Sequence, residues 1–278
     1  MKYTMHKLIK ISGLLCLSLL LSANSFAKEQ ESPKLQVCAV TQLYESLEQI
    51  KKHSTIPFEA FYGTANEIYA KIANNEKVCD VVLSSDERLP LTLVRSDKAD
   101  AVTMEPFTRA PLILWSQDPL YFKDGIKVIT QQKIKSLALA DPRLTPVGYA
   151  THLIVSNKAF KTSYLKDHIY RASHEYQILG MLSAGYVECG FITKPLISSK
   201  TKIANGSYWE VPRAYHPDLL YYSIILKNTS QKEMAQNFTL QLAHNENWQD
   251  ILNAFGFASL KIDNEPYRML LPGFKISY

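Results

Sequence analysis

Short apolar runs alternate with amphipathic segments along the first third of the chain. The runs at Leu35–Val40, 57–62 and 79–85 have the length and composition of buried strands. The segments between them, 43–50 and 64–75, repeat apolar residues at the spacing of one helix face. Strand–helix–strand units of this length favour a mostly parallel sheet with helices on both faces.

A second series of alternating segments begins near Lys135. It predicts strands at 136–140 and 186–193 and helices at 147–160 and 174–185. The chain therefore holds two separate strand–helix series rather than one continuous sheet.

Two long apolar strands, 109–117 and 219–228, connect the two series, and a last helix follows at 234–257. We therefore expect an α/β chain with two lobes, each a mostly parallel sheet flanked by helices, joined by two crossing strands. Ligands in open α/β sheets lie beyond the carboxyl ends of the strands, so we expect a binding cleft between the lobes. The predicted boundaries are 28–112 and 222–257 for the first lobe, 113–221 for the second lobe, and 258–278 for a C-terminal tail.

Residues 1–27 have the pattern of a secretory signal peptide. Three lysines and an apolar run at 14–23 are followed by the small residues Ser25 and Ala27. We expect cleavage after Ala27 and export to the periplasm. Cys16 lies inside the apolar run rather than after it, which favours a soluble product over a lipoprotein. A retained membrane anchor is the alternative.

Charge narrows the class of partner. The formal net charge is +5 for the whole chain and falls to +2 once the three lysines of the signal peptide are removed. No Lys/Arg block remains in the mature chain, so we expect no nucleic-acid partner. No second segment is apolar enough to span a membrane. The expected assembly is a monomer.

Three cysteines remain after the signal peptide: Cys38, Cys79 and Cys189. An exported protein can form disulfides, but three is an odd number. Because all three lie in or beside apolar strand-like runs, the sequence favours free buried thiols over a bridge.

The short motifs of common enzyme classes are absent from the sequence. It contains no G-x-S-x-G, P-loop, G-x-G-x-x-G, H-E-x-x-H or Cys-x-x-Cys pattern, and its seven histidines are scattered. We therefore expect no catalytic residue, no metal ligand and no resident cofactor. A binding protein is favoured over an enzyme.

Small or polar residues mark the passages from predicted strand to predicted helix. Thr41 and Gln42 follow the first strand, and Thr64 begins a Thr-x-x-Glu capping box with Glu67. Helix starts expose unpaired N–H groups and the positive end of the helix dipole. Several starts that meet in one cleft can hold an anion without Lys or Arg. Most such residues are caps only, and the box already accounts for Thr64.

The stretch LADPRLTPVGYATHL, residues 139–153, combines a strand end with a helix start. Asp141 and Pro142 end the strand, Pro146 suits a first helical turn, and Gly148 allows another backbone to approach closely. We expect the N–H of Val147 or its neighbour to point into the cleft.

Four stretches are similar to the periplasmic molybdate-binding proteins of ABC importers, in the same order over roughly 35–257. CDVVLSSDERLP (79–90) resembles the family's ADVFISADEKWM, and LADPRLTPVGYA (139–150) resembles its Gly-Asp-Pro…Pro-Ala-Gly-x-Tyr-Ala segment. VPRAYHPDLLYY (211–222) resembles a Pro-x-x-x-His stretch before a Tyr-containing strand, and ILNAFGF (251–257) resembles a closing Tyr-Gly-Phe. The resemblance implies a two-lobed periplasmic binding protein fold (type II) that captures a small oxyanion, molybdate or tungstate first, for an ABC transporter permease.

The resemblance also implies a ligand site in which hydroxyls and backbone N–H groups hold a tetrahedral oxyanion. The matching positions in this chain are Thr41, Gln42, Thr64, Ala65, Val147, Tyr176 and Thr193. Val147 and Tyr176 match backbone donors, which a change of side chain leaves intact. Gln42, Ala65 and Thr193 change hydroxyl count, reach and cavity size. Gln42 also carries an acceptor, which suits a protonated oxyanion better than a bare dianion.

Two other interpretations stay open. The same fold could bind a different ligand, either another oxyanion or a ferric ion held by Tyr221, Tyr222 and His216. A periplasmic sensor or interaction protein that kept the fold and lost the site is the third class.

Overall fold

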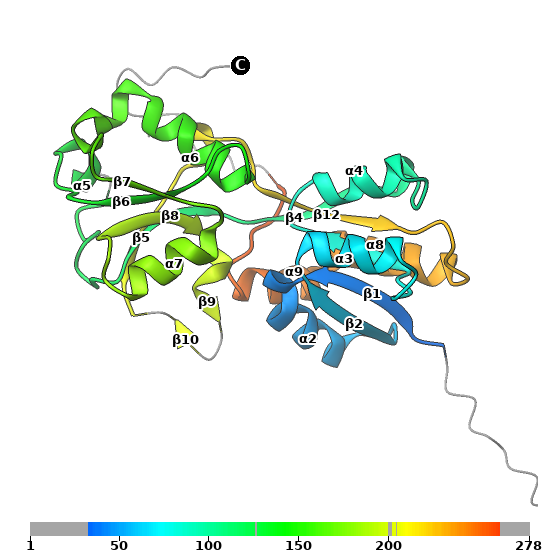
Figure 1. Ribbon diagram of the computed structural model, residues 1–278. Helices are drawn as coiled ribbons and strands as arrows, with labels where there is room; N and C mark the ends of the chain where they lie inside the picture. Colours follow the sequence, from blue (N-terminus) through cyan, green and yellow to red (C-terminus); the bar gives the residue numbers. More distant parts are fainter. Residues whose placement is uncertain (1–32, 126, 200–201, 204, 262–278) are drawn as a thin grey trace, which may run out of the picture. The chain divides into compact units, whose positions relative to one another are not determined.

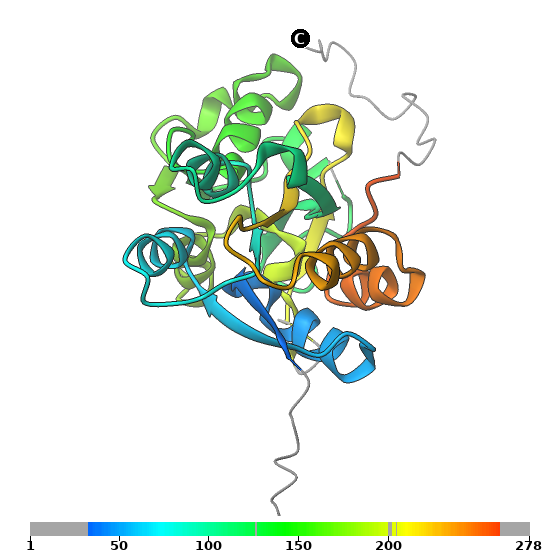
Figure 2. The ribbon, with the colours of Figure 1, turned by 90° about the vertical axis from the view of Figure 1, so that its right-hand side faces the viewer.

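Two five-stranded sheets organise the part of the chain that the structure describes (Figures 1 and 2). The computed structural model describes residues 33–125, 127–199, 202–203 and 205–261. The predicted signal peptide and residues 262–278 of the predicted tail lie outside this range. Both sheets belong to the one unit that begins at Lys34.

The first sheet has the strand order β2 (Phe58–Gly63), β1 (Leu35–Val40), β3 (Val81–Ser84), β12 (Leu220–Ile225) and β4 (Glu105–Arg109). β1 pairs in parallel with β2 and β3, whereas β12 is antiparallel to both β3 and β4. Among these five strands, β12 alone is therefore reversed.

The second sheet has the strand order β11 (Ser207–Glu210), β5 (Leu112–Ser116), β8 (Cys189–Thr193), β6 (Leu137–Ala140) and β7 (Ile169–Ala172). β6 is parallel to β7 and β8, and β5 is antiparallel to β8 and β11. Here β5 is the reversed strand, so each of the two sheets is mostly parallel, as predicted.

Helices flank both sheets (Figure 1). We call each sheet with its helices a lobe. The first lobe carries η1 (Thr41–Leu43), α2 (Tyr44–His53), α3 (Ala65–Ala73), α4 (Arg88–Arg95), η2 (Ala101–Thr103), α8 (Lys232–His244) and α9 (Glu246–Ala254). The second carries α5 (Lys127–Thr130), α6 (Pro146–Ser156), η3 (Lys158–Phe160), η4 (Thr162–Leu165), α7 (Glu175–Ser183), η5 (Lys194–Leu196), η6 (Arg213–Tyr215) and the hairpin strands β9 (Ser198–Ser199) and β10 (Lys202–Ile203). No helix among the described residues has the length and apolar character that crossing a membrane requires.

Alternate residues of β6 pack on opposite faces of the second sheet. Its two leucines join the core cluster that contains the buried residues of α6. Ala138 and Ala140 join a separate cluster with Ile178 of α7. Small residues are needed on this second face, because a Cβ at Gly190 would lie 2.6 Å from the Ile178 side chain. The two helices whose first turns reach the candidate site are thus held by opposite faces of one sheet.

The chain passes between the lobes beside Pro111. Ala110 N–H donates to the carbonyl of Leu219, and Lys194 N–H donates to the carbonyl of Pro111, both at 2.9 Å. Proline has no N–H and cannot continue a strand ladder on both sides. The apolar run at 109–117, predicted as one crossing strand, is therefore two strands, β4 and β5, in different sheets.

Three predicted boundaries differ from those of the structure. Leu112 lies in β5 of the second sheet rather than in the first lobe. Tyr221 lies in β12 of the first sheet rather than in the second lobe. The predicted helix 234–257 is two helices, because the Asn245 side chain caps the second by accepting from Trp248 N–H at 3.1 Å.

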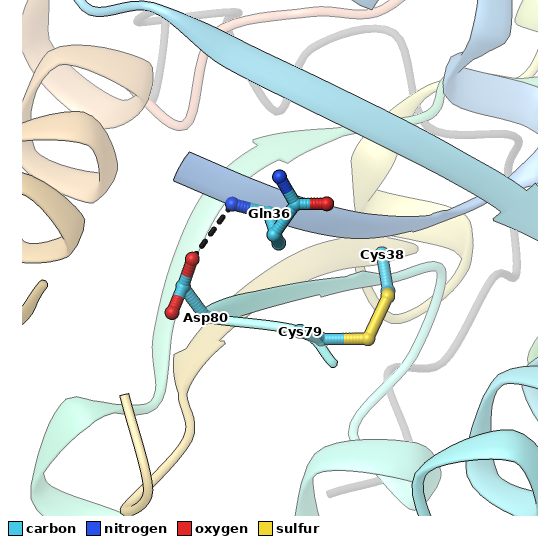
Figure 3. Close-up of a disulfide and its surroundings, with 4 residues drawn as sticks. All are labelled: Gln36, Cys38, Cys79 and Asp80. Atoms are coloured by element: carbon cyan, nitrogen blue, oxygen red, sulfur yellow. Dashed lines mark hydrogen bonds between the residues drawn. A yellow bond between two sulfur atoms is a disulfide. The ribbon is translucent and has the colours of Figure 1, made fainter. Parts of the chain in front are cut away.

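The prediction of three free thiols is wrong for two of them. Cys38 in β1 and Cys79 just before β3 form a disulfide with Cα atoms 5.8 Å apart (Figure 3). Parallel pairing of β1 with β3 brings these residues together across 41 positions of sequence, a proximity that the apolar pattern cannot encode. Cys189 is free and buried as predicted, and burial raises the pKa of its thiol.

We predict that Cys38→Ala/Cys79→Ala lowers the free energy of unfolding by about 3–4 kcal/mol, because the bridge closes a loop of some 40 residues. Urea unfolding measures the loss. Cys189→Ala is the matched control, since it removes a buried thiol without opening a loop, and its loss should be clearly smaller. Equal losses for the two variants would contradict the prediction.

Candidate functional site

A pocket of about 100 Å³ lies where the carboxyl ends of the parallel strands of both lobes meet. Its lining follows β1 and β3 in the first lobe and β6, β7 and β8 in the second, and it includes the start of the reversed strand β12. This is the edge at which open α/β sheets bind ligands. The lining residues are Gln42, Ser85, Asp86, Arg88, Thr145, Pro146, Val147, His174, Glu175, Tyr176, Thr193, Leu219 and Tyr221.

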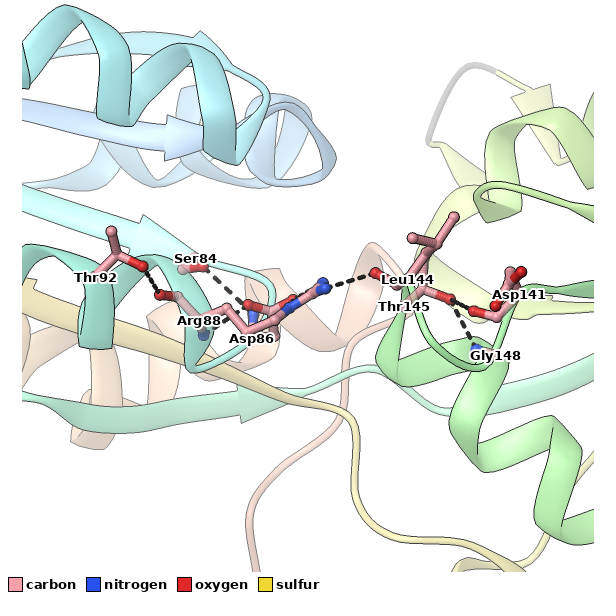
Figure 4. Close-up of polar contacts among 8 residues, drawn as sticks. All are labelled: Ser84, Asp86, Arg88, Thr92, Asp141, Leu144, Thr145 and Gly148. Atoms are coloured by element: carbon pink, nitrogen blue, oxygen red, sulfur yellow. Dashed lines mark hydrogen bonds and ion pairs between the residues drawn. The ribbon is translucent and has the colours of Figure 1, made fainter.

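The start of α6 forms one wall of the pocket. Thr145 caps the helix, because its hydroxyl oxygen accepts from Gly148 N–H at 2.9 Å (Figure 4). A Cβ at Gly148 would lie 2.3 Å from the carbonyl oxygen of Asp141. The predicted close backbone approach at this glycine is confirmed. It places the first turn of α6, with Pro146 and Val147, in the pocket lining.

The start of α7 forms the facing part of the same lobe's wall. Glu175, its first residue, is only 8% exposed. One carboxylate oxygen of Glu175 accepts from both the N–H and the hydroxyl of Thr193, each at 2.8 Å. Burial raises the pKa of Glu175, and hydrogen bonds from Thr193 and then Gln42 act in the opposite direction. The pocket therefore contains a carboxyl group whose charged form is disfavoured by its surroundings.

An ion pair at the end of β3 forms the first lobe's contribution. Asp86, 6% exposed, accepts from the backbone N–H of Arg88 at 2.9 Å and pairs with its guanidinium through two nitrogens. The same guanidinium donates to the carbonyl of Leu144 at 2.5 Å, in the loop before α6 (Figure 4). Arg88 thus neutralises the Asp86 carboxylate and links the two walls of the pocket.

Two tyrosines of the pocket lining, Tyr176 and Tyr221, have phenols with raised pKa values. Burial raises the pKa of Tyr176 to about 12. For Tyr221, burial and then the neighbouring Glu175, Tyr176 and Asp86 hold the pKa well above its ordinary value. Both phenols therefore keep their protons at neutral pH and can donate hydrogen bonds to a ligand.

The structure brings four of the seven sequence-predicted residues into the pocket lining: Gln42, Val147, Tyr176 and Thr193. Within the described chain, the backbone N–H groups of Val147 and Tyr176 have no hydrogen-bond partner. Both lie in a first helical turn, where donors are free for a ligand. The ligand-binding role of these residues remains a prediction.

The other three predicted residues lie outside the lining. Thr41 begins η1 and is exposed. Thr64 caps α3 by accepting from Glu67 N–H at 3.2 Å, as the capping box predicted, and Ala65 begins that helix. The hydroxyl of Thr64 is engaged by its own helix.

Sequence reasoning missed the charged members of the pocket. Asp86, Arg88 and Glu175 line the pocket but are not among the predicted site residues. A signal was present, because each of these residues lies within four positions of a strand end that faces the cleft. The resemblance implies a site of hydroxyl and backbone N–H donors, in which carboxylates have no part.

The residues proposed for a ferric site do not converge. Tyr221 lines the pocket, but Tyr222, its neighbour in β12, is not part of the lining. His216 is hydrogen-bonded through Nδ1 to the carbonyl of Pro217 at 2.7 Å. In the part of the chain that the structure describes, no cluster of three His, Cys, Asp or Glu residues could hold a metal ion.

Comparison with known proteins connects this geometry with one family. A family model of bacterial extracellular solute-binding proteins matches residues 39–258. The molybdate-binding protein ModA of Azotobacter vinelandii is 25% identical over 175 residues, which are 63% of this chain and 69% of that protein. The predicted resemblance to molybdate-binding proteins is confirmed.

Two solved structures share the fold. A substrate-binding domain ascribed to a molybdenum ABC transporter of Clostridium difficile superposes with a TM-score of 0.69 at 20% identity, covering 82% of this chain and 99% of that one. The periplasmic molybdate-binding protein of Azotobacter vinelandii gives 0.65 at 23% identity, covering 82% and 100%. The predicted two-lobed fold is confirmed.

We predict that Gly148→Ala lowers the free energy of unfolding by about 1–3 kcal/mol, because its Cβ would overlap the backbone of Asp141. Gly180→Ala is the matched control, since this helical glycine has nothing within 4 Å of an added Cβ. The control should be neutral or stabilising by up to about 1 kcal/mol. Urea unfolding checks both, and an unchanged Gly148→Ala midpoint would refute the close approach.

Proposed function

Since the chain belongs to the bacterial extracellular solute-binding proteins, we propose that it captures a small oxyanion in the pocket between its lobes and delivers it to an ABC transporter permease in the periplasm. It binds and releases the ligand without changing it. Molybdate and tungstate are the first candidates and sulfate-like ions the next, because ModA of Azotobacter vinelandii, matched over 69% of its length, is a molybdate-binding protein.

The observation that carries the proposal is the set of donors around one small pocket. The free N–H groups of Val147 and Tyr176 come from two helix starts, where the helix dipole favours an anion. The hydroxyl of Thr193 and the phenols of Tyr176 and Tyr221 lie in the same lining. A volume of about 100 Å³ is far below the roughly 300–1,000 Å³ of pockets for larger organic ligands.

Export and a monomeric state belong to the same proposal. The signal-peptide pattern at 1–27 and the family's extracellular character support delivery to the periplasm. Neither lobe is expected to bind nucleic acid, since the mature chain carries a formal charge of only +2 and no basic block.

A second candidate function is a periplasmic sensor or interaction protein that no longer takes an anion. One observation favours it: Glu175 already accepts both hydrogen bonds of Thr193. A ligand panel on ligand-free protein separates the two candidates, because the second predicts no response to any oxyanion.

We predict that molybdate or tungstate at about 1,000 times its dissociation constant stabilises the protein by about 4 kcal/mol. For a chain of this size the melting temperature should rise by roughly 8–16 °C. A thermal-shift panel with molybdate, tungstate, sulfate, phosphate, chromate and ferric citrate makes the measurement. A response to ferric citrate alone, or to none of these ions, would contradict the oxyanion proposal.

We also predict that Thr193→Val weakens oxyanion binding by about tenfold or more, because one hydrogen bond to a charged group is worth about 1.5–3 kcal/mol. Thr41→Val is the matched control, since Thr41 is exposed and lies outside the pocket lining. Isothermal titration of both variants tests this. Equal affinities would remove Thr193 from the site.

A further inference from the structure

The pocket contains a negative group of its own at the place where an anion would bind. Glu175 lines the pocket and is 8% exposed. One carboxylate oxygen of Glu175 accepts hydrogen bonds from the N–H and the hydroxyl of Thr193, at 2.8 Å each. The Gln42 side chain faces the same carboxylate. These are donors that a bound oxyanion would need, so Glu175 and an anion compete for them.

The second carboxylate of the pocket is in a different electrostatic state. Asp86 is held by the guanidinium of Arg88, and the pair contributes little net charge. The groups that face Glu175 from the surrounding elements are Gln42 of η1, Asp86 and Arg88 before and in α4, His174 and Tyr176 beside it, Thr193 of β8 and Tyr221 of β12. The direct hydrogen-bond partners of Glu175 are neutral, so its charge is the one left to repel an entering anion.

Resting on the proposed function, we propose that the pocket takes up its oxyanion together with one proton, and that Glu175 determines this specificity. In a buried site two negative charges in contact are strongly disfavoured. With one proton between them, the carboxyl and an oxyanion oxygen form a hydrogen bond in place of that repulsion. The freed donors of Thr193 then turn to the anion.

The proton has two possible sources, and each defines a class of ligand. A fully ionised oxyanion such as sulfate brings none, so solvent must supply H⁺ to the carboxylate of Glu175, which becomes the donor. A partly protonated oxyanion such as hydrogenphosphate brings its own and donates to Glu175 as carboxylate. Either complex contains the same atoms: one anion, one carboxylate and one proton.

The direction of the pH dependence follows from linkage. Burial already raises the pKa of Glu175, and a bound anion raises it further because it stabilises the protonated form. Affinity for an ionised oxyanion should therefore be full below the pKa of the ligand-free protein and should fall as pH rises above it, by about tenfold per pH unit.

The experiment is isothermal titration with sulfate, molybdate and phosphate between about pH 5 and about pH 8, a range that raised carboxyl pKa values occupy. Two buffers of different ionisation enthalpy count the protons bound. Wild-type protein should take up about one proton per sulfate or molybdate at the upper end of the range. Glu175→Gln keeps the size and an acceptor for Thr193, and should bind these ions without proton uptake and at least about tenfold more tightly at pH 8.

Two control variants test whether the proton uptake belongs to Glu175 rather than to another side chain. Glu188→Gln alters a hydrogen-bonded glutamate outside the pocket and should behave as wild type. His174→Gln removes the histidine of the pocket lining and should keep the proton uptake. Phosphate should be preferred over sulfate by wild type at about pH 8, and Glu175→Gln should reduce that preference by at least about tenfold.

Failure of the role of Glu175 and failure of the proposed function would give different results. Wild-type binding without proton uptake and without pH dependence overturns the role of Glu175 but leaves the proposed function standing. Proton uptake that persists in Glu175→Gln and disappears in His174→Gln has the same meaning. If neither wild type nor Glu175→Gln binds any of the three anions across the range, both the role of Glu175 and the proposed function fall.

Discussion

Two backbone hydrogen bonds at the crossing hold together the two sheets whose strand ends line the pocket. Ala110 N–H to the Leu219 carbonyl and Lys194 N–H to the Pro111 carbonyl bind the first sheet and the second sheet to the same two-residue link. They bring the carboxyl ends of the parallel strands in both lobes to one place. Thr193 precedes one of these bonds and Tyr221 follows the other, so both enter the lining by position in the chain rather than by a motif of their own.

The small pocket contains groups with opposite effects on anion binding. It gathers free helix-start N–H groups, which favour an anion, and two buried carboxylates, which oppose one. Arg88 neutralises the carboxylate of Asp86 by pairing with it, and also donates to the Leu144 carbonyl of the other lobe. The carboxylate of Glu175, by contrast, accepts hydrogen bonds only from neutral donors. The same group therefore accounts for the engaged donors of Thr193 and for the proposed discrimination between protonated and bare oxyanions.

Close packing within each lobe keeps these groups at fixed distances. In the second lobe, Gly148 and Gly190 allow α6 and α7 to approach the sheet more closely than any side chain would permit. In the first lobe, the Cys38–Cys79 disulfide ties the strand that leads to Gln42 to the strand that leads to Asp86. The donors and carboxylates thus project from a rigid frame, which is what discrimination among ions of similar size requires.

The sequence by itself determined the two strand–helix series, the mostly parallel sheets, the cap at Thr64 and the close approach at Gly148. These depend on local periodicity and on backbone limits that hold within a few residues. Of the seven site positions that the resemblance implied, four lie in the pocket lining. Only the tertiary structure decided that Pro111 divides two sheets, that Cys38 meets Cys79 and that Glu175 takes the hydrogen bonds of Thr193. Each of these joins residues distant in sequence, and their free energies depend on burial and on neighbours that no local pattern specifies.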